Sequence, residues 1–157
     1  MTGHKNNSHK KSILKFISNV VLILYLIFVA HMLFFSEDLD RTMLAKEYRY
    51  NLTPFSEIRR FWMYREQLGI RSFIINVFGN IIFFIPIGML LPNVSTKKIF
   101  RNFFGIVFIC ALGSLVLEVM QMITKVGAFD VDDIILNTIG AALGYLLFVL
   151  IRHFHKK

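Results

Sequence analysis

The chain has 157 residues, of which 55% are hydrophobic and 18% charged, and its formal net charge is +8. Ordinary soluble domains carry about 25% charged residues, so this composition favours a helical membrane protein with a single domain. The basic residues flank apolar runs, which is the pattern expected beside anionic lipid headgroups, and this argues against a nucleic-acid-binding protein. The single cysteine, Cys110, lies inside an apolar run and is expected to be a small buried residue.

The apolar runs define the expected elements. Residues 1–12 are polar and basic, and we expect them to form a disordered cytoplasmic tail. The first apolar run, 13–35, is too long for a signal-peptide core and is expected to be a retained transmembrane helix. Three further apolar runs follow, at about 73–91, 103–123 and 131–151. Runs of this length span a hydrocarbon core of ~30 Å, so the sequence predicts an all-α, polytopic membrane protein with four transmembrane helices in one domain, 13–152.

The loop at 36–72 contains a further helix signal. Thr53-Pro54 has the pattern of a helix N-cap followed by proline at the first helical position. It predicts a short interfacial helix that continues to about residue 69. An ordinary aromatic and basic interface belt is the simpler alternative for this loop. Three arginines are candidates for contact with lipid-linked phosphate: Arg59, Arg60 and Arg71.

Polar side chains interrupt or adjoin the last three apolar runs. They are Asn76, Asn80, Glu118, Gln121, Asp130, Asp132, Asp133 and Asn137. Because consecutive helices cross the bilayer in opposite directions, all of these residues come to the same leaflet. At 1.5 Å per residue, Asn80, Glu118 and Asn137 fall roughly 7 to 10 Å inside their apolar edges. Polar groups at matching depth on three helices predict a polar cavity.

Two of these runs carry polar pairs at helical spacing. Asn76 and Asn80 are four positions apart, and Glu118 and Gln121 are three apart, so each pair shares a helix face. Interhelical hydrogen bonds are a simpler explanation for the amides. Glu118 has no basic residue within its own run, and a bound cation, a loop arginine or protonation would each accommodate it.

The acids that begin the fourth run divide by helical phase. Asp130, Asp133 and Asn137 fit one stripe, whereas Asp132 points elsewhere. The alternative is that Asp130 caps the helix and Asp133 occupies its third position, where acids suit the helix dipole. Carboxylate and amide oxygens suit Mg²⁺ or Ca²⁺, so a divalent cation is chemically feasible. No metal-ligand spacing indicates one, and no other cofactor is evident.

Basic residues suggest an orientation for the expected helices. They flank the first run at its N-terminal side, occupy the connector between the second and third runs, and follow the fourth run. The basic residues of the long first loop are balanced by acids. The positive-inside rule therefore favours cytoplasmic termini, with the first loop and the 124–128 turn outside.

Four short sequence motifs of this chain, in this order, resemble those of the VanZ-like family of bacterial membrane proteins. They are Asn51-Leu52-Thr53-Pro54-Phe55 in the first loop, Asn80 to Gly88 in the second run, Glu118 to Gln121 in the third, and Gly127 to Gly140 entering the fourth. The resemblance covers about residues 50–145. It implies a multi-pass protein of the bacterial plasma membrane, in a family whose name-giving member is linked to low-level resistance to teicoplanin-type lipoglycopeptides. It supplies motif positions and no catalytic residue.

Three functions fit these features. The leading hypothesis is a VanZ-like protein that acts at the outer leaflet, where it limits access of lipoglycopeptides to lipid-linked cell-wall precursors or alters an envelope component that they recognise. The second is a membrane-embedded enzyme for a polyprenyl- or glycan-linked envelope substrate, with Glu118 or Asp133 as general acid or base. The third is a non-catalytic membrane partner or small transporter. The sequence specifies neither the ligand nor the oligomeric state.

Overall fold

The structure, a computed structural model, describes residues 3–35, 48–94 and 96–154. Within these ranges, four helices contain segments long and apolar enough to cross a membrane: α1 (Gly3–Phe35), α4 (Ile70–Val94), α5 (Phe103–Thr124) and α6 (Val131–Phe154). Short elements connect them: β1 (Tyr50–Asn51), α2 (Ser56–Met63), α3 (Arg65–Leu68), η2 (Lys98–Arg101) and β2 (Phe129–Asp130). The prediction of an all-α polytopic membrane protein is confirmed.

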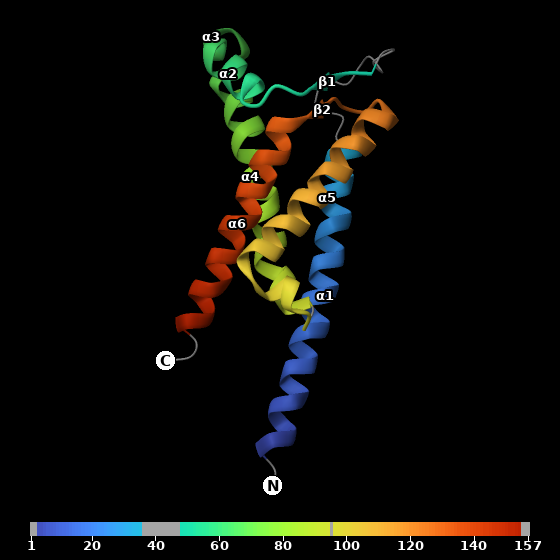
Figure 1. Ribbon diagram of the computed structural model, residues 1–157, viewed down its shortest axis with the longest axis vertical. Coiled ribbons are helices and arrows are strands. Elements are labelled where there is room, and N and C mark those ends of the chain that lie inside the picture. Colours follow the sequence, from blue (N-terminus) through green and yellow to red (C-terminus); the bar gives the residue numbers. More distant parts are fainter. Residues whose placement is uncertain (1–2, 36–47, 95, 155–157) are drawn as a thin grey trace.

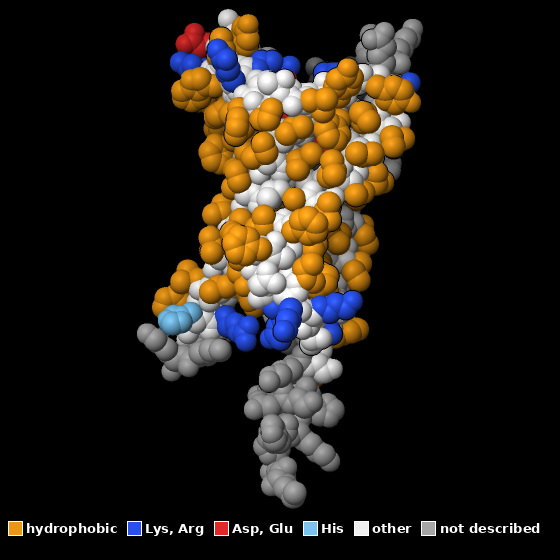
Figure 2. All heavy atoms as spheres, viewed as in Figure 1, with side chains coloured by type: hydrophobic (Ala, Val, Ile, Leu, Met, Phe, Trp, Pro, Cys, Tyr) orange, Lys and Arg blue, Asp and Glu red, His pale blue; other side chains and the backbone are white. Residues whose placement is uncertain are grey.

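The four long helices alternate in direction. The start of α1 and the end of α6 lie at one end of the molecule, and α2, α3 and the β1–β2 pair lie at the other (Figure 1). We call the second of these the loop end. Figure 2 shows hydrophobic side chains over the middle of the molecule and Lys and Arg side chains gathered towards both ends. Large exposed residues such as Phe104 and Ile123 belong to this apolar middle, as expected where lipid rather than water surrounds a helix.

Helices α4 and α6 are in backbone contact through glycines. A Cβ atom added to Gly140 would lie 2.2 Å from the Ile81 carbonyl oxygen, and one added to Gly144 would lie 2.0 Å from that of Ile85. On α4, a Cβ atom added to Gly88 would lie 2.0 Å from the carbonyl oxygen of Ala141 on α6. Small residues let two helices approach closely where the hydrophobic effect does not drive them together. This contact sets the spacing between the α4 and α6 side chains nearer the loop end.

The remaining helices pack around this pair. On α1, Ser18, Leu22 and Val29 are buried along one face, and the Tyr25 hydroxyl donates to the Phe83 carbonyl oxygen at 2.9 Å. Helix α5 begins at an N-cap, since the Asn102 side chain accepts from Gly105 N at 2.7 Å. The prediction that Cys110 is a buried residue is confirmed, with 3% of its surface exposed.

Several predicted boundaries differ from the structure. Helix α4 begins at Ile70 rather than at about residue 73, and α6 continues to Phe154 rather than ending at about residue 151. Residues 3–12, expected to be a disordered tail, continue α1, because once a helix exists each further residue adds one hydrogen bond. Helix α4 continues through Pro86 and Pro92 to Val94, beyond the predicted end at residue 91.

The predicted cap of the interfacial helix is wrong. Helix α2 begins at Ser56, with Phe55 as its N-cap in the left-handed conformation at φ 65°. Thr53 instead donates its backbone N–H to Asn51 Oδ1 at 3.1 Å, which holds Thr53 and Pro54 in a turn. The helix is also interrupted at Tyr64, which separates α2 from α3.

A short parallel strand pair joins the first loop to the start of α6. Tyr50 pairs with Phe129, and Asn51 pairs with Asp130. The partners Asn51 and Asp130 are 79 residues apart in the chain. The pair brings the first loop against the α5–α6 turn at the loop end (Figure 1).

Candidate functional site

A small polar cavity lies between the long helices, close to the loop end. Its polar lining comes from α4, α5 and α6, namely Asn80, Glu118, Gln121, Asp133 and Asn137. Its apolar lining is Val29, Phe83, Phe84 and Leu117. The cavity volume is about 20 Å³, which is room for about one water molecule or one ion. The structure therefore brings together five of the eight residues expected around a polar cavity.

Helices α5 and α6 are linked by hydrogen bonds at this cavity. Glu118 is buried, with 4% of its surface exposed, and its Oε2 accepts from the backbone N of Asp130 at 3.0 Å. Asn137 Nδ2 donates to Ser114 Oγ at 2.8 Å, and Ser114 is fully buried. A hydrogen bond within a buried polar network of this kind contributes about 1 kcal/mol.

Helix α4 reaches the cavity through Asn80. Its Nδ2 atom donates to Asp133 Oδ1. This contact lies on the same helix pair as the glycine contact at Gly140. The position of Asn80 against Asp133 therefore depends on how closely α4 and α6 approach.

Asp132 has a different environment, which we call the loop clamp. Its side chain is almost completely buried, with 1% of its surface exposed. Oδ1 accepts from the backbone N–H of Phe55, and Oδ2 accepts from those of Glu57 at 2.9 Å and Ile58 at 3.2 Å. These groups form the N-terminus of α2, where unpaired N–H groups and the positive end of the helix dipole favour an anion. Asp132 thus attaches α2 to α6.

Asn51 and Asp130 hold the turn that precedes the loop clamp. Asn51 Nδ2 donates to Asp130 Oδ1 at 3.1 Å, and Asn51 Oδ1 accepts from Ser56 Oγ at 2.8 Å. Asp130 Oδ1 also accepts from Asp132 N at 2.8 Å. This last bond is the capping contact that the sequence allowed for Asp130. The Asn51-Leu-Thr-Pro-Phe motif therefore orders the loop in the structure.

The Asp130 carboxyl is perturbed by its surroundings. Partial burial raises its pKa, and the nearby charges of Asp132 and Glu57 act in the same direction. The hydrogen bonds that it accepts from Asp132 N and Asn51 oppose this shift but do not cancel it. Asp130 is therefore easier to protonate in the folded protein than in an unfolded chain.

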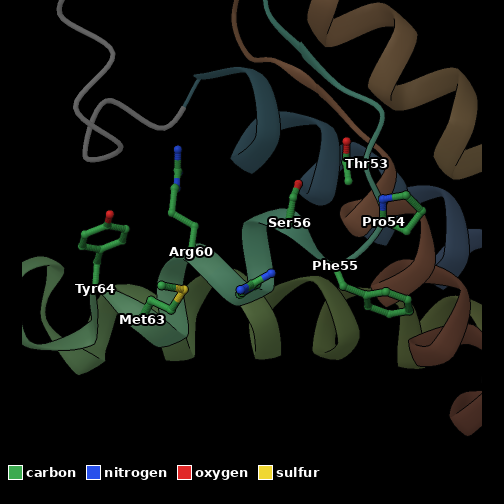
Figure 3. A pocket seen from close by; sticks show the side chains of 8 residues that line it. Thr53, Pro54, Phe55, Ser56, Arg60, Met63 and Tyr64 are labelled. Carbon is green, nitrogen blue, oxygen red and sulfur yellow. The ribbon is translucent and has the colours of Figure 1, made fainter.

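An open hollow on α2 also lies at the loop end, and it is larger than the polar cavity. Its volume is about 480 Å³, which is on the scale of small-molecule sites of roughly 300 to 1,000 Å³. It is lined by Thr53, Pro54, Phe55, Ser56, Arg59, Arg60, Met63 and Tyr64. Figure 3 shows the side chains of Arg60, on α2, and Tyr64, which follows α2, extending towards the same side.

The α2 hollow is cationic at its surface. The Arg59 and Arg60 side chains are both exposed. Arg60 also forms an ion pair with Glu57 at 2.6 Å and lies 5.2 Å from the Phe61 ring centroid. The loop clamp lies at the N-terminal end of this helix, so Asp132 determines where the hollow sits relative to the membrane helices.

Besides Asp132, three predicted site residues lie outside the polar cavity and the α2 hollow. Asn76 is exposed and does not line the polar cavity, because the four-residue spacing to Asn80 specifies a shared face but not how far a cavity extends along the helix. Asp130 is a strand residue outside the stripe formed by Asp133 and Asn137. Arg71 is exposed in the first turn of α4 and does not line the α2 hollow.

Two residues that contribute to the site were missed from the sequence. Ser114 precedes Glu118 by four positions and Gln121 by seven, so helical spacing alone could have placed it on the same face. Ser56 had no comparable signal, because its partner Asn51 lies in the strand before the turn.

Comparisons with known proteins agree with the motif pattern. The model of the family described as VanZ/LLP1 matches residues 22–152. Protein VanZ of Enterococcus faecium is 33% identical over 147 residues, which cover 91% of this chain and 81% of that protein. No solved structure matches this chain. The extent of the family match and the identity to a curated relative over most of both chains show that this membrane protein belongs to the VanZ/LLP1 family.

Proposed function

We propose that this protein lowers the susceptibility of a bacterial cell to teicoplanin-type lipoglycopeptides by acting at the outer leaflet of the plasma membrane. Its membership of the VanZ/LLP1 family supports this proposal. The supporting structural observation is the α2 hollow, which presents Arg59 and Arg60 beside aromatic and apolar side chains. In this proposal both termini are cytoplasmic and the loop end faces outward.

The chemistry of the α2 hollow suits an anionic amphiphile. Guanidinium groups bind phosphate and carboxylate through paired hydrogen bonds. Phe55, Met63 and Tyr64 supply apolar and aromatic surface next to these cations. A lipid-linked cell-wall precursor presents phosphate beside an apolar chain, and a lipoglycopeptide presents anionic groups beside an acyl chain. Binding of either one would reduce their encounter at the membrane surface.

The polar cavity is less suited to hold such a ligand. Its volume of about 20 Å³ admits about one water molecule and no sugar or phosphate group. An enzymatic role for Glu118 or Asp133 would require a substrate group to reach them. We therefore assign ligand contact to the α2 hollow. Comparative mass spectrometry of envelope lipids, with and without the gene, tests this choice, since a chemically altered lipid would favour the enzymatic alternative.

The decisive experiment measures teicoplanin inhibition in a susceptible host that expresses the protein. Wild type is expected to raise the inhibitory concentration, and Arg59→Gln with Arg60→Gln is expected to abolish that rise. Arg152→Gln, at the opposite end of the molecule, is the matched control and is expected to retain it at equal membrane abundance. If wild type changes nothing, the resistance proposal fails. If the double variant keeps full effect, the α2 hollow is not the site.

A further inference from the structure

The polar cavity contains more oxygen acceptors than the surrounding protein uses. The Nδ2 atoms of Asn80 and Asn137 donate to Asp133 and Ser114, respectively. In the described residues, no donor reaches the Oδ1 atom of either asparagine. The Gln121 side chain is 9% exposed and lines the same cavity, yet its amide has no hydrogen-bond partner in the described part of the chain. Polar groups that border an internal cavity are normally satisfied by something inside it, such as a water molecule or an ion.

The cavity also has two acids and no basic side chain in its lining. Glu118 and Asp133 both line it, and its other lining residues include no Lys, Arg or His. The Glu57–Arg60 ion pair lies at the surface and involves neither cavity acid. Two carboxylates held together in an apolar setting are costly unless a positive partner is present.

We propose that the polar cavity binds one hard divalent cation, with Ca²⁺ preferred. Two carboxylates and three amides provide only oxygen ligands, which are the ligands that Ca²⁺ and Mg²⁺ accept. No group of three His, Cys, Asp or Glu residues in the described ranges is placed to hold a metal ion, so an ion in this cavity would take its remaining ligands from the amide oxygens. Zinc is disfavoured, because the cavity lining includes no His or Cys.

The size of the cavity selects between the two hard cations. Its volume of about 20 Å³ leaves no space for the several water molecules that Mg²⁺ usually keeps. Ca²⁺ accepts a flexible set of protein oxygens instead. A bound cation would tie α4, α5 and α6 together at one depth, because each of these helices supplies an oxygen ligand from Asn80, Glu118 or Asp133. This proposal does not depend on the function assigned to the α2 hollow.

The test uses the full chain, purified in detergent and stripped with a chelator. Equilibrium dialysis against radioactive Ca²⁺ is expected to show one ion per chain, and added Ca²⁺ is expected to raise the Tm more than Mg²⁺ at the same concentration. Absence of stoichiometric binding by wild type overturns the proposal, whatever the variants do. The measurement involves no antibiotic, so its failure leaves the resistance proposal intact.

Variants locate the site. Glu118→Gln and Asp133→Asn each remove one negative charge and are expected to weaken Ca²⁺ binding by at least roughly tenfold. Gln121→Leu removes a neutral ligand and is expected to have a smaller effect. Glu66→Gln, on the exposed α3 helix, is the matched control and is expected to bind as wild type does. Undiminished binding by a Glu118→Gln, Asp133→Asn double variant would place the ion elsewhere and contradict the proposal.

A second measurement compares the Tm of wild type and of Glu118→Gln with and without Ca²⁺. If Glu118 had only a structural role, the difference in Tm would not depend on Ca²⁺. Without Ca²⁺, Glu118→Gln removes an uncompensated charge, so its Tm is expected to equal or exceed that of wild type. With Ca²⁺, the order reverses, because only wild type gains from the ion. A Glu118→Gln variant whose Tm responds to Ca²⁺ as wild type does would contradict the proposal.

Discussion

Two neighbouring carboxylates at the start of α6 have opposite surroundings. Asp132 accepts three backbone N–H groups from the N-terminus of α2. Asp133 faces a cavity that it shares with Glu118 and accepts from Asn80. Successive residues of a helix point about 100° apart, so adjacent acids reach different neighbours. The loop clamp is complete within the chain, whereas the polar cavity retains unused oxygen atoms.

The two acids therefore differ in role at the loop end: Asp132 holds α2 in place, and Asp133 is available to a ligand. Asp132 accepts three backbone N–H groups and is almost completely buried, so a ligand has no access to it. Asp132 therefore positions α2 and the hollow on it, and Asp133 and Glu118 are the acids placed to bind something else. Substitutions at each region should have distinct signatures.

Removal of the loop clamp should have the largest effect. Asp132→Ala leaves three N–H groups of α2 without their acceptor, and we expect a loss of about 3 kcal/mol in the docking of α2, since each charged hydrogen bond contributes about 1.5 to 3 kcal/mol before rehydration. Trp62 is the only tryptophan, lies on α2 and packs 5.8 Å from the Phe73 ring. Its fluorescence should therefore shift when α2 separates.

The matched control for the loop clamp is Glu118→Gln. It changes an equally buried acid of the cavity and should leave the emission of Trp62 unchanged. Equal shifts in the two variants would mean that the loop clamp and the polar cavity are one cooperative unit rather than two.

A change at the α4–α6 contact should come next. Gly140→Ala places a methyl group against the Ile81 backbone at 2.2 Å, and overpacking of this kind is expected to destabilise the protein by about 2 kcal/mol. It should also draw Asn80 away from Asp133 while leaving the loop clamp in place. Gly113→Ala, where an added Cβ meets nothing within 4 Å, should be neutral or slightly stabilising. Unfolding in mixed detergent measures both.

Loss of one hydrogen bond inside the cavity network should have a smaller effect. Ser114→Ala removes the acceptor for Asn137 Nδ2 and is expected to cost about 1 kcal/mol. Ser114→Thr keeps a hydroxyl and reports the effect of size alone. The same unfolding assay applies, and a stability equal to wild type in Ser114→Ala would mean that Asn137 finds another acceptor.

The smallest expected effect is a pH dependence from Asp130. Its folded-state pKa is raised, chiefly by burial, so the folded state binds its proton more tightly than the unfolded state does. The resulting penalty is present in full above the folded pKa and is relieved as pH falls through that value towards the ordinary carboxyl range. Asp130→Asn keeps an acceptor oxygen and should reduce the gain in stability that wild type shows on acidification. Identical unfolding profiles from pH 7 to pH 4 would contradict this assignment.

Local patterns in the sequence determined the membrane architecture. Apolar runs of sufficient length specify four spans, and their alternation brings polar residues to one end, because burial of apolar side chains and satisfaction of backbone hydrogen bonds depend on the neighbouring few residues. Helical spacing likewise placed Glu118 with Gln121 and Asp133 with Asn137 on the cavity side. These features need no knowledge of distant partners.

Only the tertiary structure determines the hydrogen-bond partner of each polar residue. The acceptor for the α2 N-terminus is Asp132, about 75 residues away in the chain, and the partner of Asn51 is 79 residues away. Neither pairing can be recognised from the neighbouring residues. The sequence therefore predicted Thr53-Pro54 as a helix start and Asp130 as part of a helical stripe. The physical reason is that an exposed helix end and a buried carboxylate each need a partner, but the identity of that partner depends on how distant segments pack.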